Sequence, residues 1–281
     1  MKYWLFRIAT IVVPRIPRVI ARPLAELAGL LAWALAGKAR RRVEYNLSHV
    51  PTLAGHPRAL RRAARGVFQH TALNYLDFLR GPHLSDAEIR DRWVIEGLDL
   101  FHQSMAQGKG MVILTGHFGN WEFGVSRLGL EGYPIVAPAE RMRPERLFEL
   151  FCRTREHHGV RLLPADNRET LRHLIDALKA NQLAAFAVDR YVVGSSMELP
   201  FFGKPARLPT APMALALRTG APVMAIFSWR DPGGWRHGRF IPLDLSAAAA
   251  PALTPAAAAA AAGARDGEPP ARVHSSEAVA R

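Results

Sequence analysis

The sequence predicts an α/β protein in which helices flank a mixed sheet, with a helical membrane anchor before the sheet and a disordered tail after it. Three segments support this organisation. Residues 1–42 are basic and apolar, residues 43–245 alternate short apolar runs with helical periodicity, and residues 246–281 are rich in alanine and proline. The length of 281 residues and the apolar fraction of 49% are enough for a sizeable core in the middle segment.

The first segment combines positive charge with apolar runs. Residues 1–42 hold nine basic side chains and one acidic one, which contributes +8 of the formal net charge of +13. The apolar runs at 3–13 and 24–37 are each interrupted by a charge before they reach the roughly 18 uncharged residues of a spanning helix. We therefore expect helices that lie in the interface of an anionic membrane, with Trp4 and Trp33 near headgroup depth. The alternative for 24–37 is an ordinary core helix.

Composition also bears on partners and compartment. Nucleic-acid binding would use the same charge, but the basic residues lie among Leu, Ile and Val, which favours lipid, and no nucleic-acid partner is expected. The single cysteine, Cys152, excludes an intrachain disulfide and fits a reducing compartment. Its apolar neighbours at helical spacing indicate a buried thiol.

The middle segment shows the periodicities of both kinds of secondary structure. Apolar residues at three- and four-residue steps predict a helix over 57–80, ended by Gly81-Pro82. From Trp93 onward, apolar runs alternate with helical stretches, which is typical of a sheet with helices on its faces. The expected strands are Trp93–Glu96, Met111–Thr115, Ile135–Ala137, Arg161–Leu163, Leu183–Val188 and Pro222–Trp229, and the expected helices are Leu98–Gln107, Glu122–Leu130, Pro144–His158, Thr170–Ala180 and Thr210–Thr219.

The end of the chain has almost no large apolar side chain with which to build a core. We expect residues 246–281 to be disordered. The seven alanines at 256–262 have a high helix propensity and are expected to be transiently helical.

A histidine and an acid lie five positions apart in two places, His117 with Glu122 and His83 with Glu88. This spacing alone cannot choose between them, because about one match is expected by chance. His83 lies in a linker before a helix cap, whereas His117 follows the strand run over 111–115, and α/β folds place their sites in loops at the carboxyl ends of strands. The context therefore favours His117.

The chemistry of the favoured pair suits acyl transfer. His117 could take a proton from a hydroxyl, and Glu122 could hold the imidazole by one ring nitrogen and stabilise the imidazolium. No serine or cysteine nucleophile is apparent beside the pair, so the simple inference is direct attack of that hydroxyl on an activated acyl carbon. The alternative is a half-buried structural histidine at the end of a sheet.

The stretch HisPheGlyAsnTrpGlu (117–122) resembles the His-x4-acid box of the bacterial lipid A biosynthesis acyltransferases, the lauroyl and myristoyl transferases of the lysophospholipid acyltransferase superfamily. It is also similar to phosphatidylinositol mannoside acyltransferases, in which the acid is usually aspartate. The resemblance runs from about Arg42 to Asp244. Further matches are AsnLeuSerHisVal (46–50), AspAsnArgGluThrLeuArg (166–172), AlaValAspArgTyr (187–191), LeuProPhePheGlyLysProAlaArgLeuProThrAlaPro (199–212) and ArgThrGlyAlaProVal (218–223).

The resemblance implies a glycerolipid-acyltransferase-like fold and an O-acyltransferase that needs no cofactor or metal. The acyl thioester would be carried by acyl carrier protein or coenzyme A, and the acceptor would be a hydroxyl of a membrane glycolipid. It also implies an enzyme bound to the cytoplasmic face of the inner membrane. His117 and Glu122 take the catalytic positions, and the functional arginine and acid of the family fall on Arg168 and Asp189. Asn120, within the box, is a further candidate for substrate binding. By their charge, Lys204 and Arg207 could form a phosphate patch with Arg190, or they could simply be solvated.

Several alternatives remain open. Arg168 and Asp189 could meet at the sheet end that carries His117, or form a structural ion pair. Phe201-Phe202 could line an acyl groove or belong to the core. The usual helix and Pro/Trp-rich end of the family is replaced here by alanine-rich sequence. The rival functions are a lipid esterase, although the chain has no Gly-x-Ser-x-Gly elbow, and a catalytically inactive membrane-binding relative.

Overall fold

Two compact units divide the chain, Met1–Leu243 and Asp244–Arg281. The tail expected to be disordered, residues 246–281, lies outside the described residues. The structure, a computed structural model, describes residues 2–91, 93–119, 124, 127–156, 159–231, 233 and 235–245.

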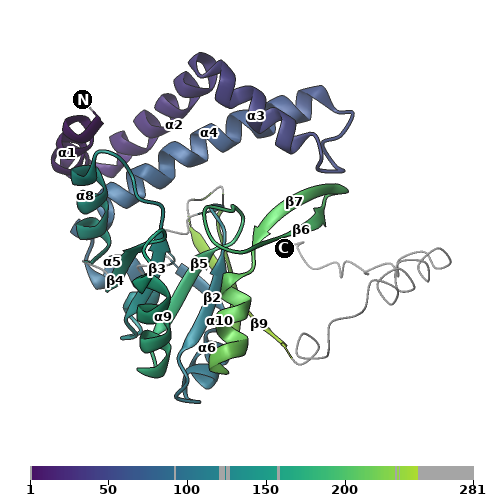
Figure 1. Cartoon of the computed structure of the whole chain (residues 1–281). Coiled ribbons are helices and arrows are strands. Elements are labelled where there is room, and N and C mark those ends of the chain that lie inside the picture. Colours follow the sequence, from purple (N-terminus) through teal and green to yellow (C-terminus); the bar gives the residue numbers. More distant parts are fainter. Residues whose placement is uncertain are drawn as a thin grey trace, which may run out of the picture. The chain divides into compact units, whose positions relative to one another are not determined.

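A seven-stranded sheet in the order β1-β9-β8-β2-β5-β3-β4 forms the centre of the first unit (Figure 1). The strands β8, β2, β5, β3 and β4 are parallel, whereas β9 is antiparallel to β8 and parallel to β1. The predicted mixed sheet is therefore confirmed, and it is mostly parallel. The strands are β1 (Trp93–Glu96), β2 (Met111–Thr115), β3 (Ile135–Ala139), β4 (Val160–Pro164), β5 (Leu183–Ala187), β8 (Val223–Arg230) and β9 (Arg236–Leu243).

Every strand expected from the apolar runs is present, and the described residues contain three strands that these runs did not predict. Two of these, β6 (Ser196–Phe201) and β7 (Lys204–Pro209), form a separate antiparallel hairpin. The third is β9, whose sequence ArgHisGlyArgPheIleProLeu contains a glycine, a proline and three basic residues. Such residues are depleted in strands, so tertiary pairing with β8 and β1 decides the conformation of β9.

Helices cover the sheet as the alternating pattern predicted. The core between them contains Phe101, Met111, Ile135, Leu183 and Met224, all buried. Of the expected helix at 122–130, residues 122, 123, 125 and 126 lie outside the described residues, and residues 124 and 127–129 are helical. The other helices from residue 86 onward are α5 (Asp86–Arg90), α6 (Leu98–Met105), α8 (Glu145–Glu156), α9 (Glu169–Lys179) and α10 (Ala211–Thr219).

Four N-terminal helices form a separate layer beside the sheet (Figure 1). These are α1 (Lys2–Val12), α2 (Arg18–Leu35), α3 (Gly37–Leu47) and α4 (Pro57–Arg80), and α4 has the predicted bounds of 57–80. Gly29 of α2 packs so closely on α4 that an added Cβ would lie 2.6 Å from the Cα of Gln69. Since a larger residue could not be accommodated without movement, α2 is seated directly on α4.

This layer leaves apolar side chains exposed. Leu5, Ile8 and Val19 are exposed, although α2 also contributes Ala21 to a small core with Leu73 and Leu76 of α4. Trp33 lies beneath the guanidinium groups of Arg40 and Arg65, at 5.4 and 5.6 Å from its ring. Among the described residues no single helix has the length and apolar composition of a membrane span, whereas α2 and α3, bent by 93° at their junction, meet those criteria together.

Candidate active site

The register of the sheet places His117 beside Asp189. Strands β2 and β5 are parallel neighbours in which Thr115 is paired with Ala187, and the ladder continues through the bond from Val188 N–H to the Thr115 carbonyl, 2.9 Å. His117 lies two residues beyond Thr115, and Asp189 lies two residues beyond Ala187. Because the two strands end at the same edge, these side chains lie next to each other at the carboxyl end of the sheet.

Asp189 holds His117 by two hydrogen bonds. The ring Nδ1 lies 2.9 Å from Oδ1 of Asp189, and the backbone N–H of His117 donates to Oδ2 at 3.0 Å. An ionised carboxylate can only accept, so in the neutral ring Nδ1 carries the proton. Nε2 is then the nitrogen that can take a proton from a substrate.

Electrostatics favour the ionised form of Asp189. Partial burial acts to raise the pKa of Asp189, but the hydrogen bonds from the ring and backbone N–H of His117 outweigh it and hold this pKa below its ordinary value. The contribution of this carboxylate to the free energy of unfolding is therefore fully present at pH values above the ordinary pKa of an aspartate. It is lost as the pH falls through the lowered pKa of Asp189. The His117 side chain remains 47% exposed, so it is accessible to a substrate.

The turn that carries His117 is fixed by close packing against β8. Gly119 has a positive φ of 59°, and an added Cβ would lie 1.6 Å from the carbonyl oxygen of Ser228. Phe118 stacks on Phe227, with ring centroids 5.4 Å apart. Only glycine is compatible with so close an approach of the backbone to Ser228. The close packing of the turn on the sheet therefore explains the glycine at position 119.

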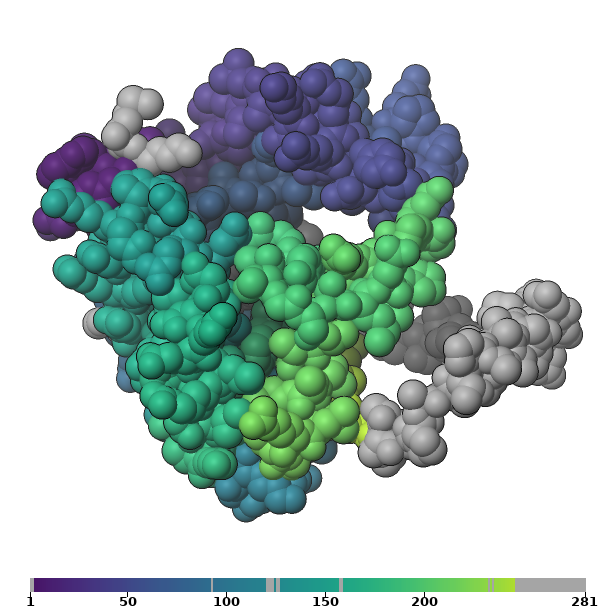
Figure 2. Space-filling model, viewed as in Figure 1, coloured from purple at the N-terminus to yellow at the C-terminus, as the bar shows by residue number. Residues whose placement is uncertain are grey.

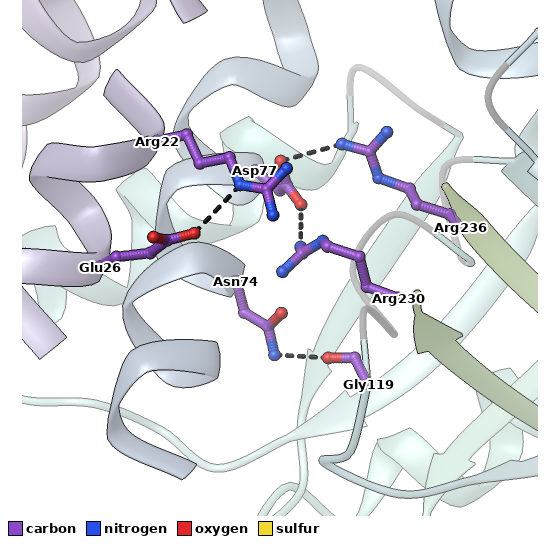
Figure 3. Close-up of polar contacts among 7 residues, drawn as sticks. All are labelled: Arg22, Glu26, Asn74, Asp77, Gly119, Arg230 and Arg236. Atoms are coloured by element: carbon purple, nitrogen blue, oxygen red, sulfur yellow. Dashed lines mark hydrogen bonds and ion pairs between the residues drawn. The ribbon is translucent and has the colours of Figure 1, made fainter. Parts of the chain in front are cut away.

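Helix α4 contacts the same turn from the N-terminal layer (Figure 3). The side-chain amide of Asn74 donates to the carbonyl of Gly119 at 2.6 Å. One turn further along α4, Asp77 accepts hydrogen bonds from Arg230 and Arg236, which are opposite each other in the β8–β9 ladder. Like charges directly opposite in a sheet repel, so the largely buried Asp77 stabilises this pair and ties α4 to the sheet.

The alternative histidine pair does not form a site. His83 lies in a short 3₁₀ helix, Gly81–His83, and Glu88 is engaged in a capping box with Ser85 at the start of α5. The Glu88 carboxylate accepts from the backbone N–H of Ser85 at 3.0 Å and from its hydroxyl at 2.9 Å. The predicted helix cap at Ser85 is confirmed.

Other predicted site residues take separate positions. Arg168 is exposed at the N-terminus of α9, after β4, and is therefore at the same end of the sheet as His117 but towards its edge. The alternative ion pair of Arg168 with Asp189 does not form among the described residues. Lys204 begins β7 at the tip of the hairpin, and Arg207 lies over the ring of Tyr191, 5.4 Å from its centroid. Glu122 and Asn120 lie outside the described residues.

Sequence reasoning missed the contribution of α4. Asn74 and Asp77 interrupt a helix face that carries the buried residues Leu73, Leu76 and Leu79. Polar side chains within an otherwise apolar stripe are a signal that could have identified them, since a buried polar group needs a partner. Their partners, at residues 119, 230 and 236, are too distant in sequence to be inferred without the fold.

Metal ligands and the single cysteine are two further potential sources of chemistry. In the described part of the chain, no three His, Cys, Asp or Glu side chains are placed so that they could ligate a metal ion. Cys152 on α8 is partly buried, and burial raises the pKa of its thiol, as expected of an unreactive cysteine.

Comparisons with known proteins identify a family and curated relatives. A family model described as bacterial lipid A biosynthesis acyltransferase matches residues 1–254. The phosphatidylinositol mannoside acyltransferase of Mycobacterium tuberculosis (strain CDC 1551 / Oshkosh) is 32% identical over 165 residues, which cover 58% of this chain and 52% of that protein. The protein of the same description from Mycolicibacterium smegmatis is 28% identical over 179 residues, 63% of this chain and 59% of that protein. The chain thus spans between about half and three-fifths of the length of these curated relatives.

Proposed function

The chain belongs to the bacterial lipid A biosynthesis acyltransferase family, and from this premise we propose that it transfers a fatty acyl chain from an acyl thioester to a hydroxyl of a membrane glycolipid. The observation that carries the proposal is the hydrogen-bonded pair of His117 and Asp189 at the carboxyl ends of β2 and β5. A histidine held in this way is suited to general-base chemistry.

The proposed reaction uses the two nitrogens of the ring for different tasks. Asp189 accepts a hydrogen bond from Nδ1–H, and Nε2 removes the proton from the acceptor hydroxyl as its oxygen attacks the thioester carbonyl carbon. The negative charge of Asp189 stabilises the imidazolium that forms. When the carbon–sulfur bond breaks, the imidazolium returns its proton to the leaving thiolate. The products are an ester and a free thiol, and the enzyme is unchanged.

We propose Glu122 as a second acid of this site. The sequence places it five residues after His117, in the box that resembles the family motif. Since Asp189 occupies Nδ1, the orienting function first expected of Glu122 is at least shared with Asp189. Asn120 is proposed to bind substrate from the same box.

Anionic parts of the substrates are assigned to the basic residues. Arg168 lies at the same end of the sheet as His117. It is suited to bind a phosphate because a guanidinium group can donate two parallel hydrogen bonds to one oxyanion. We propose Lys204 and Arg207 as further contacts to the acceptor. The donor is acyl carrier protein or acyl-coenzyme A. The mannoside-type relatives support an acceptor like a phosphatidylinositol mannoside, with a lipid A precursor as the alternative.

A membrane surface is proposed to contact the N-terminal layer. Residues 1–42 would be the anchor, residues 43–245 the acyltransferase domain and residues 246–281 the alanine- and proline-rich tail. One face of α3 carries Lys38, Arg41 and Arg42, which line an open pocket of about 750 Å³ together with Tyr45 and Asn46. Three cations without an acid suit anionic headgroups. We propose the cytoplasmic face of the inner membrane as the location, as the resemblance to the family implies.

The choice of substrates is tested by supplying the purified chain with one labelled acyl thioester and a panel of lipid acceptors. The panel contains phosphatidylinositol mannosides, a lipid A precursor and a phospholipid without sugar. A labelled glycolipid product supports the proposal and identifies the acceptor. Label found only in free fatty acid would favour the esterase, and no turnover with any acceptor would favour the inactive relative.

The membrane contact predicts a loss of binding when exposed apolar residues of the N-terminal layer are made polar. Leu5→Ser, Ile8→Ser and Val19→Ser combined should shift the protein from the membrane pellet to the supernatant, because each change removes roughly 1.5–3 kcal/mol of apolar transfer. These side chains are exposed, so the melting temperature should be little changed. Complete release of the unchanged protein by high salt would contradict an apolar contribution and leave only charge.

The contact between α4 and the catalytic turn gives a further prediction. Asn74→Ala removes the donor to the Gly119 carbonyl and should lower kcat by about 10–100-fold with little change in the KM for the donor, because the turn that carries His117 is displaced. Thr71→Ala is the control, since its hydroxyl bonds to Val67 within the same helix and should not affect kcat. A fall in kcat that matches only the loss of folded protein would show that Asn74 is structural.

A further inference from the structure

The β6–β7 hairpin is amphipathic although it stands apart from the seven-stranded sheet. Residues paired across an antiparallel ladder share a face, and the pairs Met197↔Leu208, Leu199↔Ala206 and Phe201↔Lys204 therefore lie together. The opposite face carries Ser196↔Pro209, Glu198↔Arg207 and Pro200↔Pro205. One face is thus apolar up to the lysine at its tip, and the other is polar or proline.

The apolar face is largely exposed. Met197 is 53% exposed, and at the tip Phe201 and Phe202 are 59% and 51% exposed, with ring centroids 4.6 Å apart. Of the two alternatives left open for these phenylalanines, a place in the core is therefore wrong. An isolated hairpin is at best marginally stable in water, and contiguous exposed apolar surface indicates an interaction site.

The chemistry of the tip matches a lipid interface. Phe201 is paired with Lys204 in the ladder, and Phe202 follows Phe201. Aromatic residues beside a lysine are the combination found where protein side chains enter the headgroup region. Among the described residues, the apolar face of the hairpin carries this one cation and no acid, so it complements an anionic surface. The polar face of the hairpin instead contacts the protein itself, since the guanidinium group of Arg207 lies over the ring of Tyr191.

The hairpin also lies on the correct side of the molecule. It begins seven residues after Asp189, and it therefore leaves the sheet at the end that carries His117. The N-terminal layer reaches the same end, because Asn74 of α4 contacts Gly119. In the view of Figure 2 the green hairpin stands out from the sheet below the purple and blue helices. A bilayer that contacted both would face His117.

We propose that the apolar face of the β6–β7 hairpin, with Phe201 and Phe202 at its tip, is a second membrane contact that enters an anionic bilayer interface. This contact is additional to the N-terminal helices, and it would fix the angle at which the catalytic turn meets the lipid surface. The inference goes beyond the proposed function and rests on it only in that a lipid acceptor brings the chain to a bilayer.

Site-specific fluorescence on the full chain tests the contact. In a Cys152→Ala background, Phe201→Cys carries an environment-sensitive fluorophore, and Leu217→Cys is the control because this residue is similarly exposed, 49%, near the end of α10. Vesicles of phosphatidylcholine and phosphatidylglycerol in equal parts should shift the emission of the first label to shorter wavelength and leave the second unchanged. Phe201→Ser with Phe202→Ser should weaken vesicle binding by about tenfold or more.

Three results would overturn the inference. The Phe201 label could remain unchanged while the chain sediments with vesicles. The label could respond to acyl carrier protein and not to vesicles, which would indicate a protein partner. Its signal could also rise with protein concentration in the absence of lipid, which would indicate a second copy of the chain. None of these measurements uses acyl transfer, so the proposed function can fail or stand independently of them.

Discussion

His117→Ala is expected to lower acyl transfer by about 10²–10⁴-fold, the usual contribution of a general base. The ring is 47% exposed, so its removal leaves no large cavity and the melting temperature should change little. The initial rate of transfer from a labelled acyl thioester measures the effect, and a thermal melt of the same sample shows that the variant is folded.

His83→Ala is the matched control for this prediction. His83 has the same spacing to an acid in the sequence, but Glu88 is engaged in the cap of α5 and no catalytic residue is nearby in the chain. Its replacement should leave the rate near that of the unchanged protein. Equal losses in two folded variants would show that His117 has no special role.

Asp189→Asn is expected to produce a second large loss, of about 10²–10⁴-fold in kcat, with little change in the KM for the acyl donor. The amide keeps the shape of the side chain but removes the charge that stabilises the imidazolium. An amide N–H facing Nδ1 would also move the ring proton to Nε2, which is the wrong tautomer for a base. Steady-state kinetics across neutral pH measure the loss.

Two comparisons make the assignment of Asp189 specific. If Glu122 also acts through His117, then Glu122→Gln should lower the rate as well, and the double variant should lose little more than the worse single one, because residues that act as a unit are not additive. By contrast, an Asp189→Asn variant that melts several degrees lower but turns over normally would make Asp189 a structural partner of the turn.

Much of the fold could be predicted from the sequence because local patterns of apolar residues determine many of its strands and helices. The apolar runs gave β2 and β5, and the helical period gave α4 over 57–80. The hairpin and β9 could not be predicted in this way. Prolines interrupt β6 and β7, and β9 combines basic residues with Gly and Pro, so their strands depend on pairing with partners and not on composition.

The candidate site was predicted in part for the same reason. The loop after a buried strand identified His117, and the resemblance identified Asp189, but the contact between them depends on β2 and β5 being neighbours. Strands whose paired residues are 72 positions apart in the chain can be neighbours only through the order of the sheet, which no local pattern encodes. The contact of Asn74 with Gly119 likewise requires the docking of α4.

The claim that His117 and Asp189 support acyl transfer to a lipid hydroxyl is tested most directly by following both products of one labelled acyl thioester. The thiol and the labelled lipid are measured together, with and without the glycolipid acceptor. We predict one labelled glycolipid for each thiol released, with both products dependent on the acceptor and on His117. Thiol released at the same rate without acceptor, with the label in free fatty acid, would contradict the account.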